Sequence, residues 1–321
     1  MARPQDLLLF ALRPSEALGR AVAAIRGLEV APHELRLFDD GEHKIRPLVS
    51  VRGRDVYVLC SLWGEVGDSA NDRLCRLLFF VGAVRDAGAA RITVVAPYLC
   101  YARKDRRTKP NDPIITRYVA AMFESVGIDR IITVEVHNVA AFENAFRCPT
   151  WHIEIAPLLA AHFAGALHGE QTVAVSPDAG GAKRAEAFRQ SMEQLSRKDV
   201  GSAYMEKFRS SGVVSGELLA GDVRDKVAII VDDLISTGGT LVRAAKACRA
   251  AGATKVFAAA AHGLFMGGAP ELFATNAIDG ITIVNTVPPF RLSSETAARR
   301  LTVLDASEAI ARAIAACHDG S

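Results

Sequence analysis

Short apolar runs alternate with longer amphipathic runs along most of the chain. The apolar runs lack the strict every-second-residue alternation of a strand with one exposed face, so they predict strands buried on both faces. These predicted strands are Val56–Leu62, Ile92–Pro97, Ile131–Val136, Thr172–Ser176, Val227–Val231, Val256–Ala261 and Ile281–Val284. The amphipathic runs predict helices at Asn71–Ala87, Ile114–Val126, Gly181–Gln194 and Thr240–Ala251. Strand–helix alternation of this kind predicts an α/β fold with mainly parallel sheets.

One segment of the chain occurs twice, about half a chain apart. Leu78–Leu99 and Val242–Leu264 each contain the end of a predicted helix, then Ala-Gly-Ala, then a predicted strand. Glycine suits the left-handed position that closes a helix. A length of 321 residues is enough for two domains. We therefore predict two related domains in tandem, 1–149 and 150–304; the final helix 305–318 could pack on the first domain, which the sequence does not decide.

The composition is that of a globular protein, with 50% hydrophobic and 23% charged residues. A formal net charge of +2 gives no reason to expect nucleic acid or an anionic membrane as partner. No apolar stretch approaches the ~18 residues that a membrane span needs. The six cysteines form no C-x-x-C pair and are expected to be reduced, buried thiols. These features together predict a cytoplasmic protein.

The segment Val227–Thr240, VAIIVDDLISTGGT, carries the strongest chemical signal. A buried strand leads into Asp232 and Asp233, and a short loop then opens a helix. The glycines let the backbone approach a phosphate, and the N–H groups at a helix start attract anions. Adjacent carboxylates can accept hydrogen bonds from sugar hydroxyls or hold Mg²⁺. The plain alternative is a strand–turn–helix junction, and the two acids at a fixed distance before the glycines argue against it.

Four further segments are individually ordinary but occur together in one order: FDDGE at 38–42, PYLCYARKDRR at 97–107, EVH at 135–137 and SPDAGGAKR at 176–184. With the 227–240 segment, whose pattern is that of type I phosphoribosyltransferase folds, they make the chain resemble the ribose-phosphate pyrophosphokinase (PRPP synthetase) family. The resemblance extends over nearly the whole length. It implies two phosphoribosyltransferase-type domains, the first binding ATP and the second binding ribose 5-phosphate.

The resemblance also implies roles for particular residues. The implied ATP site comprises Phe38, Asp40, Gly41, Glu42, Arg103, Lys104, Asp105 and His137. An aromatic ring and a guanidinium can sandwich adenine between them, which agrees with this assignment. The implied ribose 5-phosphate site comprises Asp232, Asp233, Ser236, Thr237, Gly238, Gly239 and Thr240. The implied ligands of the Mg²⁺ that accompanies ATP are His137 and Asp178.

Lys207 and Arg209 are the implied catalytic residues, on a mobile loop that closes over the reacting phosphates. Positive charge there can stabilise the transition state of phosphoryl transfer. The implied reaction transfers the β,γ-diphosphate of ATP to the 1-hydroxyl of ribose 5-phosphate, with the two substrates meeting between the domains. The resemblance further implies a homo-oligomer, a dimer or a hexamer built from dimers.

Several positions depart from common family patterns. Glu135 and Val136 replace Asp and Leu before His137, Ser236 replaces an acid, and Phe208 separates Lys207 from Arg209. Many relatives carry Gln where this chain has Lys104. These departures leave open the allosteric response to ADP and phosphate and the choice of nucleotide. Two other functions stay open on the sequence alone: a phosphoribosyltransferase that consumes PRPP, and a catalytically silent subunit associated with PRPP synthetase.

Overall fold

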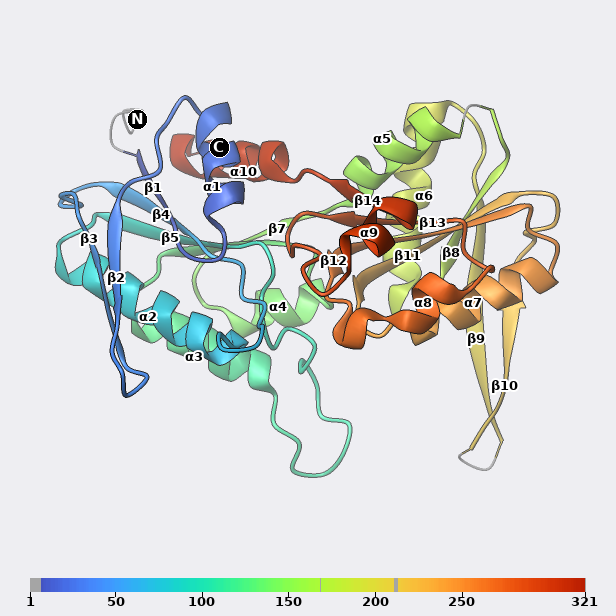
Figure 1. The fold of residues 1–321 in the computed structure, drawn as a ribbon, viewed down its shortest axis with the longest axis horizontal. Coiled ribbons are helices and arrows are strands. Elements are labelled where there is room, and N and C mark those ends of the chain that lie inside the picture. The colour runs from blue at the N-terminus through green and yellow to red at the C-terminus, as the bar shows by residue number, and fades with distance from the viewer. Residues whose placement is uncertain (1–6, 168, 211–212, 321) are drawn as a thin grey trace. The chain divides into compact units, whose positions relative to one another are not determined.

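The computed structural model describes residues 7–167, 169–210 and 213–320, and between 207 and 217 it describes the backbone only. The chain divides into two compact units (Figure 1). Unit 1 contains the chain up to Ile153 together with the segment from Ala306 onward, and unit 2 runs from Glu154 to Asp305. The final helix therefore lies with the first unit.

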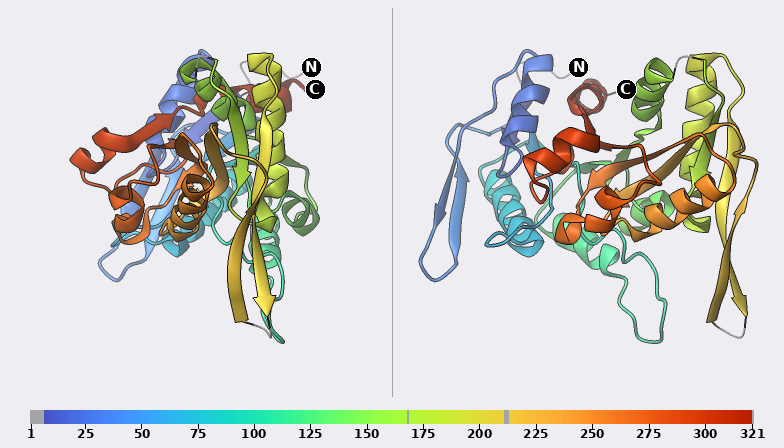
Figure 2. Two further views of the ribbon diagram at one scale, coloured as in Figure 1. Left: turned by 90° about the vertical axis from the view of Figure 1, so that its right-hand side faces the viewer. Right: turned by 45° about the vertical axis from the view of Figure 1, so that its right-hand side comes forward.

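Unit 1 is built on a five-stranded parallel sheet in the order β1-β4-β5-β6-β7. Its strands are β1 (Leu7–Ala11), β4 (Asp55–Leu59), β5 (Arg91–Ala96), β6 (Arg130–Val134) and β7 (Thr150–Ile153). One face is covered by α2 (Ala70–Asp86), α3 (Ile115–Ser125) and α4 (Val139–Ala145), whose apolar side chains complete one core cluster with that face. The other face carries α1 (Glu16–Ile25) and α10 (Ser307–Asp319), as Figures 1 and 2 show.

Buried polar contacts attach α10 to the amino ends of three strands of unit 1. His318 Nδ1 lies 2.6 Å from the Asp55 carboxylate, which also accepts hydrogen bonds from Arg91. Arg130 donates to the Cys317 carbonyl at 2.9 Å. Buried hydrogen bonds to charged groups contribute more than neutral ones, so these contacts fix the last helix on unit 1.

A two-stranded antiparallel ribbon stands apart from the main sheet of unit 1. It pairs β2 (His33–Leu37) with β3 (His43–Pro47), and its turn is Phe38–Glu42. The His43 ring stacks on Phe79 of α2 with centroids 5.3 Å apart, which holds the ribbon against that helix next to its turn. The segment FDDGE is therefore the tip of a hairpin.

Unit 2 has a seven-stranded sheet in the order β10-β9-β8-β11-β12-β13-β14, parallel except for the pair β9 and β10. Its strands are β8 (Thr172–Ser176), β9 (Gly201–Ser210), β10 (Val213–Ala220), β11 (Val227–Ile235), β12 (Lys255–Gly263), β13 (Gly280–Val284) and β14 (Leu301–Leu304). Its helices are α5 (Ala156–Ala166), α6 (Ala182–Ser196), α7 (Gly239–Ala250), α8 (Pro270–Ala274) and α9 (Ser294–Arg300). The prediction of an α/β fold with mainly parallel sheets is confirmed.

The repeated sequence segment corresponds to a repeated structure. In unit 1, Arg85 at the end of α2 forms an ion pair with Asp129, which accepts the Ile92 backbone N–H of β5. In unit 2, Arg249 at the end of α7 forms an ion pair with Asp279, which accepts the Val256 N–H of β12. In both units, an arginine at the end of a helix and the backbone N–H of the next strand thus contact one aspartate, which lies just before the strand after that. This shared arrangement supports two units of one architectural type.

Candidate functional site

The carboxyl end of β11 places two aspartates in the middle of the sheet of unit 2. β11 lies between β8 and β12, and in α/β sheets ligands bind beyond the carboxyl ends of such strands. The strand continues through both acids to Ile235, four residues beyond the predicted end. Asp233 is buried, and its backbone N–H donates to Asp232 Oδ1 at 2.8 Å.

The loop after β11 presents the start of α7 without a side-chain cap. Gly238 precedes the helix with φ of +83°, a left-handed conformation that glycine adopts without strain. A Cβ at Gly238 would lie 2.8 Å from the Leu272 Cβ of α8, so only glycine fits there. The exposed N–H groups and the helix dipole form a ready anion site. The structure thus brings together the predicted phosphate-binding residues 236–240.

The equivalent helix of unit 1 begins differently. Ser69 caps α2 in a capping box, because its hydroxyl accepts the Asp72 N–H and the Asp72 carboxylate accepts the Ser69 N–H. The fully buried Arg73 side chain fills the adjoining loop and donates to the Trp63 carbonyl at 2.5 Å. The start of α2 is therefore satisfied by its own side chains, whereas the start of α7 is left open to a ligand.

Burial, together with the hydrogen bond and charge of neighbouring Asp233, raises the pKa of Asp232 to about 8. The guanidinium of Arg184 opposes this effect from 3.8 Å away. The site therefore holds an acid pair whose negative charge is only partly compensated. Groups that stabilise the ionised form, such as a hydroxyl donor or a cation, would bind there favourably.

Arg184 and Arg243 are site residues that sequence reasoning did not single out. Arg184 lies in the first turn of α6 with a largely buried side chain, and Arg243 donates to the Thr240 hydroxyl at 3.4 Å. The available signal was position: each arginine follows a glycine pair by three or four residues, at the start of a helix. Both add positive charge beside the predicted phosphate loop.

Asp178 lies in the turn between β8 and α6. Its Oδ1 accepts the backbone N–H groups of Gly180 and Gly181, at 2.8 and 3.1 Å, and this fixes the orientation of the carboxylate. Gly181 is closely packed, since a Cβ there would lie 2.8 Å from the Ser176 hydroxyl. The turn therefore presents a rigidly held carboxylate at the edge of the sheet.

In unit 1, the predicted ATP-site residues of the 97–107 segment and of the EVH segment lie together. Asn138, next to the exposed His137, donates to the Asp105 carboxylate at 2.7 Å and also caps α4. Lys104 is held by a hydrogen bond from its N–H to the Tyr101 carbonyl. Arg103 and Lys104 are exposed. The carboxyl ends of β5 and β6 thus bring Arg103, Lys104, Asp105 and His137 to one edge of the sheet.

Phe38 is not part of that group within one chain. The residue is 39% exposed, and the Arg36 guanidinium lies 5.2 Å from the ring centroid. Asp40 accepts the Glu42 N–H at 3.0 Å, and Gly41 has φ of +90°, so these residues shape the hairpin tip. Figures 1 and 2 both show this tip apart from the 97–114 loop of the same unit.

Lys207 and Arg209 lie in β9, paired with Glu217 and Val214 of β10. The backbone there is a strand of a long antiparallel ribbon, whereas the sequence predicted a loop; strand pairing with β10 extends the ordered backbone to Ser210. The side chains of both residues lie outside the described part of the structure.

No group of three or more His, Cys, Asp or Glu side chains among the described residues could hold a metal ion on its own. Within the same described ranges, no helix is both long and apolar enough to cross a membrane.

Comparison with known proteins identifies the class and then the family. Residues 7–127 match the N-terminal domain of ribose phosphate pyrophosphokinase, and residues 164–321 match the phosphoribosyl synthetase-associated domain. The phosphoribosylpyrophosphate synthetase of Mycobacterium smegmatis superimposes with a TM-score of 0.87 at 31% identity, covering 98% of this chain and all of that one. The fold and the phosphate loop thus define an α/β protein of phosphoribosyltransferase type.

Two curated relatives extend the match. Ribose-phosphate pyrophosphokinase 1 of Streptococcus pyogenes is 34% identical over 315 residues, which is 98% of this chain and 95% of the relative. Ribose-phosphate pyrophosphokinase of Caldanaerobacter subterraneus is 35% identical over 322 residues, with 100% and 98% coverage. The chain belongs to the ribose-phosphate pyrophosphokinase family.

Proposed function

We propose that the protein transfers the β,γ-diphosphate of ATP to ribose 5-phosphate and so forms PRPP and AMP. The observation that carries the proposal is the open, uncapped start of α7 directly after Asp232 and Asp233, in a chain whose relatives match over nearly their full length. The phosphate loop alone would also serve an enzyme that consumes PRPP. The match over both units, including the segments of unit 1, favours synthesis.

Ribose 5-phosphate would bind in unit 2. Backbone N–H groups and hydroxyls of Ser236–Thr240 would hold its 5-phosphate, supported by the charge of Arg243. Asp232 and Asp233 would accept hydrogen bonds from the ribose hydroxyls. The rigid loop, closed by the contact of Gly238 with Leu272, would fix the sugar in one orientation, which is the main requirement for an in-line reaction.

ATP would bind in unit 1, at the edge formed by Arg103, Lys104, Asp105 and His137. The adenine would stack between Arg103 and an aromatic ring. Because the hairpin tip 38–42 stands apart from the 97–114 loop within one chain, we propose that the aromatic ring of Phe38, with Asp40, Gly41 and Glu42, comes from a second copy of the chain. The complete adenine site would then require at least a dimer.

In the reaction, the 1-hydroxyl oxygen of ribose 5-phosphate forms a bond to the β-phosphorus of ATP. The bond from that phosphorus to the oxygen bridging it to the α-phosphate breaks, AMP leaves with that oxygen, and the hydroxyl proton is lost. Lys207 and Arg209 would neutralise the charge that develops on the transferred group. This role rests on their sequence positions in the β9–β10 ribbon.

Mg²⁺ is the cofactor that the donor set suits. Asp178 offers one firmly oriented carboxylate and His137 an exposed imidazole, and Mg²⁺ typically takes one or two carboxylates together with substrate phosphates and waters. Bound with ATP, it would supply Lewis-acid stabilisation of the phosphate charge. Asp178 would be a ligand of the ion, and the Gly180 and Gly181 N–H groups would keep its carboxylate in one orientation.

An assay of AMP formation from ATP and ribose 5-phosphate by the purified chain tests the proposal. We expect AMP and PRPP in equal amounts, dependent on Mg²⁺. PRPP consumption with a nucleobase and no AMP formation would instead identify a phosphoribosyltransferase. Absence of turnover by a folded chain that binds both ligands would indicate a silent subunit.

A further inference from the structure

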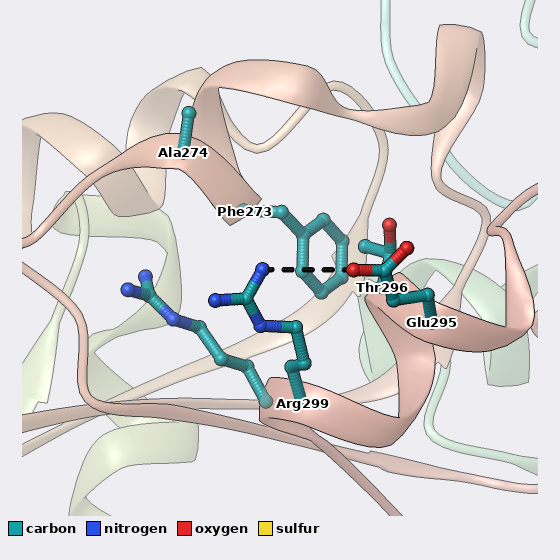
Figure 3. Close-up of a pocket in the computed structure, with 6 residues that line it drawn as sticks. Phe273, Ala274, Glu295, Thr296 and Arg299 are labelled. Atoms are coloured by element: carbon teal, nitrogen blue, oxygen red, sulfur yellow. Dashed lines mark ion pairs between the residues drawn. The ribbon is translucent and has the colours of Figure 1, made fainter.

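A cavity in unit 2 lies outside the substrate site described above. It has a volume of about 370 Å³ and lies between α8 and α9 (Figure 3). Its lining residues are Phe273, Ala274, Glu295, Thr296, Arg299 and Arg300. Cavities of this size accommodate small metabolites.

The lining combines positive charge with an aromatic ring. Arg299 is 77% exposed in its side chain, and its ion-pair partner Glu295 is 3.9 Å away, too far for a hydrogen bond. Figure 3 shows the Arg299 guanidinium directed into the space between α9 and the Phe273 ring. Arg300 is anchored by hydrogen bonds to the carbonyls of Thr275 and Ile278, so its charge is fixed at the cavity wall.

These groups match a particular ligand chemistry. Two adjacent guanidinium groups favour a phosphate, which they can bind through several N–H donors. The Phe273 face, packed from behind by Phe265 with ring centroids 5.5 Å apart, is suited to a planar base. We propose that the cavity between α8 and α9 binds a nucleoside monophosphate or a similar phosphorylated ring compound.

Residues beside and behind the cavity wall contact the predicted phosphate loop. Leu272, adjacent to Phe273 in α8, is fully buried and lies against Gly238, the residue before α7. Phe265, behind the Phe273 ring, donates its N–H to the Ile235 carbonyl at the end of β11, and Met266 donates to the Ser236 carbonyl. A ligand that restrains α8 would therefore restrain the loop that is proposed to hold the 5-phosphate. The proposal that the cavity binds a ligand does not depend on the proposed function. Only the coupling to the 5-phosphate loop rests on that function.

Hydrogen exchange with AMP as probe tests the binding step, because it reports location and needs no turnover. We expect AMP to slow hydrogen exchange in peptides covering 270–274 and 294–300, and adenosine alone to have little effect. Arg299→Glu should weaken the AMP-induced slowing of exchange about tenfold or more. Arg312→Glu is the matched control: Arg312 is 74% exposed and pairs with Glu308 four residues away at 3.6 Å, on α10 of unit 1. It should leave the effect unchanged.

Absence of protection in these peptides with millimolar AMP, or equal protection in Arg299→Glu, would overturn the site. Calorimetry tests the coupling: ribose 5-phosphate affinity should change with AMP in the parent and in Arg312→Glu, but not in Arg299→Glu. A change that persists in Arg299→Glu would place its origin elsewhere and overturn the coupling. AMP formation by Arg299→Glu without added effector should equal that of the parent, which separates this test from the proposed function.

Discussion

Replacing Gly238 with alanine tests the geometry of the phosphate loop. The residue has φ of +83°, where an L side chain costs about 1–2 kcal/mol. The added Cβ would also lie 2.8 Å from the Leu272 Cβ, and forced packing of this kind typically costs about 1–3 kcal/mol. Leu272 is fully buried, so the clash must move α8 or the start of α7. The displaced N–H groups would then fit a phosphate poorly.

Gly88→Ala provides the control for backbone strain. Gly88 has φ of +87°, but the nearest atoms to a Cβ added there are Arg52 side-chain atoms at 3.7 Å, an ordinary contact distance. Both variants should lose thermal stability, by about 2–4 °C per kcal/mol in a domain of this size, and Gly238→Ala should lose more. In steady-state assays, only Gly238→Ala should raise the KM for ribose 5-phosphate, with the KM for ATP little changed. A folded Gly238→Ala enzyme with an unaltered ribose 5-phosphate KM would refute the assignment of the loop.

Three further predictions concern the other parts of the site. Lys207→Ala should lower kcat by roughly 10²–10⁴-fold with modest changes in KM, because its charge matters mainly in the transition state; an effect on KM alone would show that it only binds substrate. Phe38→Ala should raise the ATP KM about 5- to 150-fold through loss of a stacking face of ~1–3 kcal/mol, and unchanged ATP binding by the folded variant would exclude Phe38 from the adenine site. Asp232→Asn should abolish tight ribose 5-phosphate binding yet stabilise the unliganded protein. Because the pKa of Asp232 is raised in the folded protein, the stability of the wild type should fall as pH rises from the ordinary carboxyl pKa toward about 8. The gain in Tm of Asp232→Asn over the wild type should therefore grow from pH 5 to 8 and then level off. A gain that does not depend on pH would contradict the raised pKa.

Local chemistry made the strands and the turn from β11 into α7 predictable. The predicted strand Thr172–Ser176 matches β8. The junction of β11 and α7 depends on neighbouring residues, and its glycines indicate in the sequence where the backbone turns. Contacts between distant positions were not predictable. The approach of Arg184 to Asp232 joins α6 to β11, and the contact of His318 with Asp55 joins residues 263 positions apart. The strand character of Lys207 and Arg209 was also missed, because pairing with β10 outweighs the polar composition of the segment.

The two units show how one framework can leave a helix start open in one copy and cap it with side chains in the other. Both place a helix after a central strand and join the helix end to the sheet through the same arginine and aspartate contacts. At the start of α2, Ser69 and Asp72 satisfy each other's N–H groups, and buried Arg73 supplies the positive charge itself. At the start of α7, glycine replaces the capping side chain, and the open N–H groups follow two aspartates. A phosphate in unit 1 would have to displace an internal cap, whereas in unit 2 it would satisfy donors that the fold leaves open. The choice of side chains at one helix start, on a shared backbone plan, therefore supports the proposed placement of the sugar phosphate in unit 2.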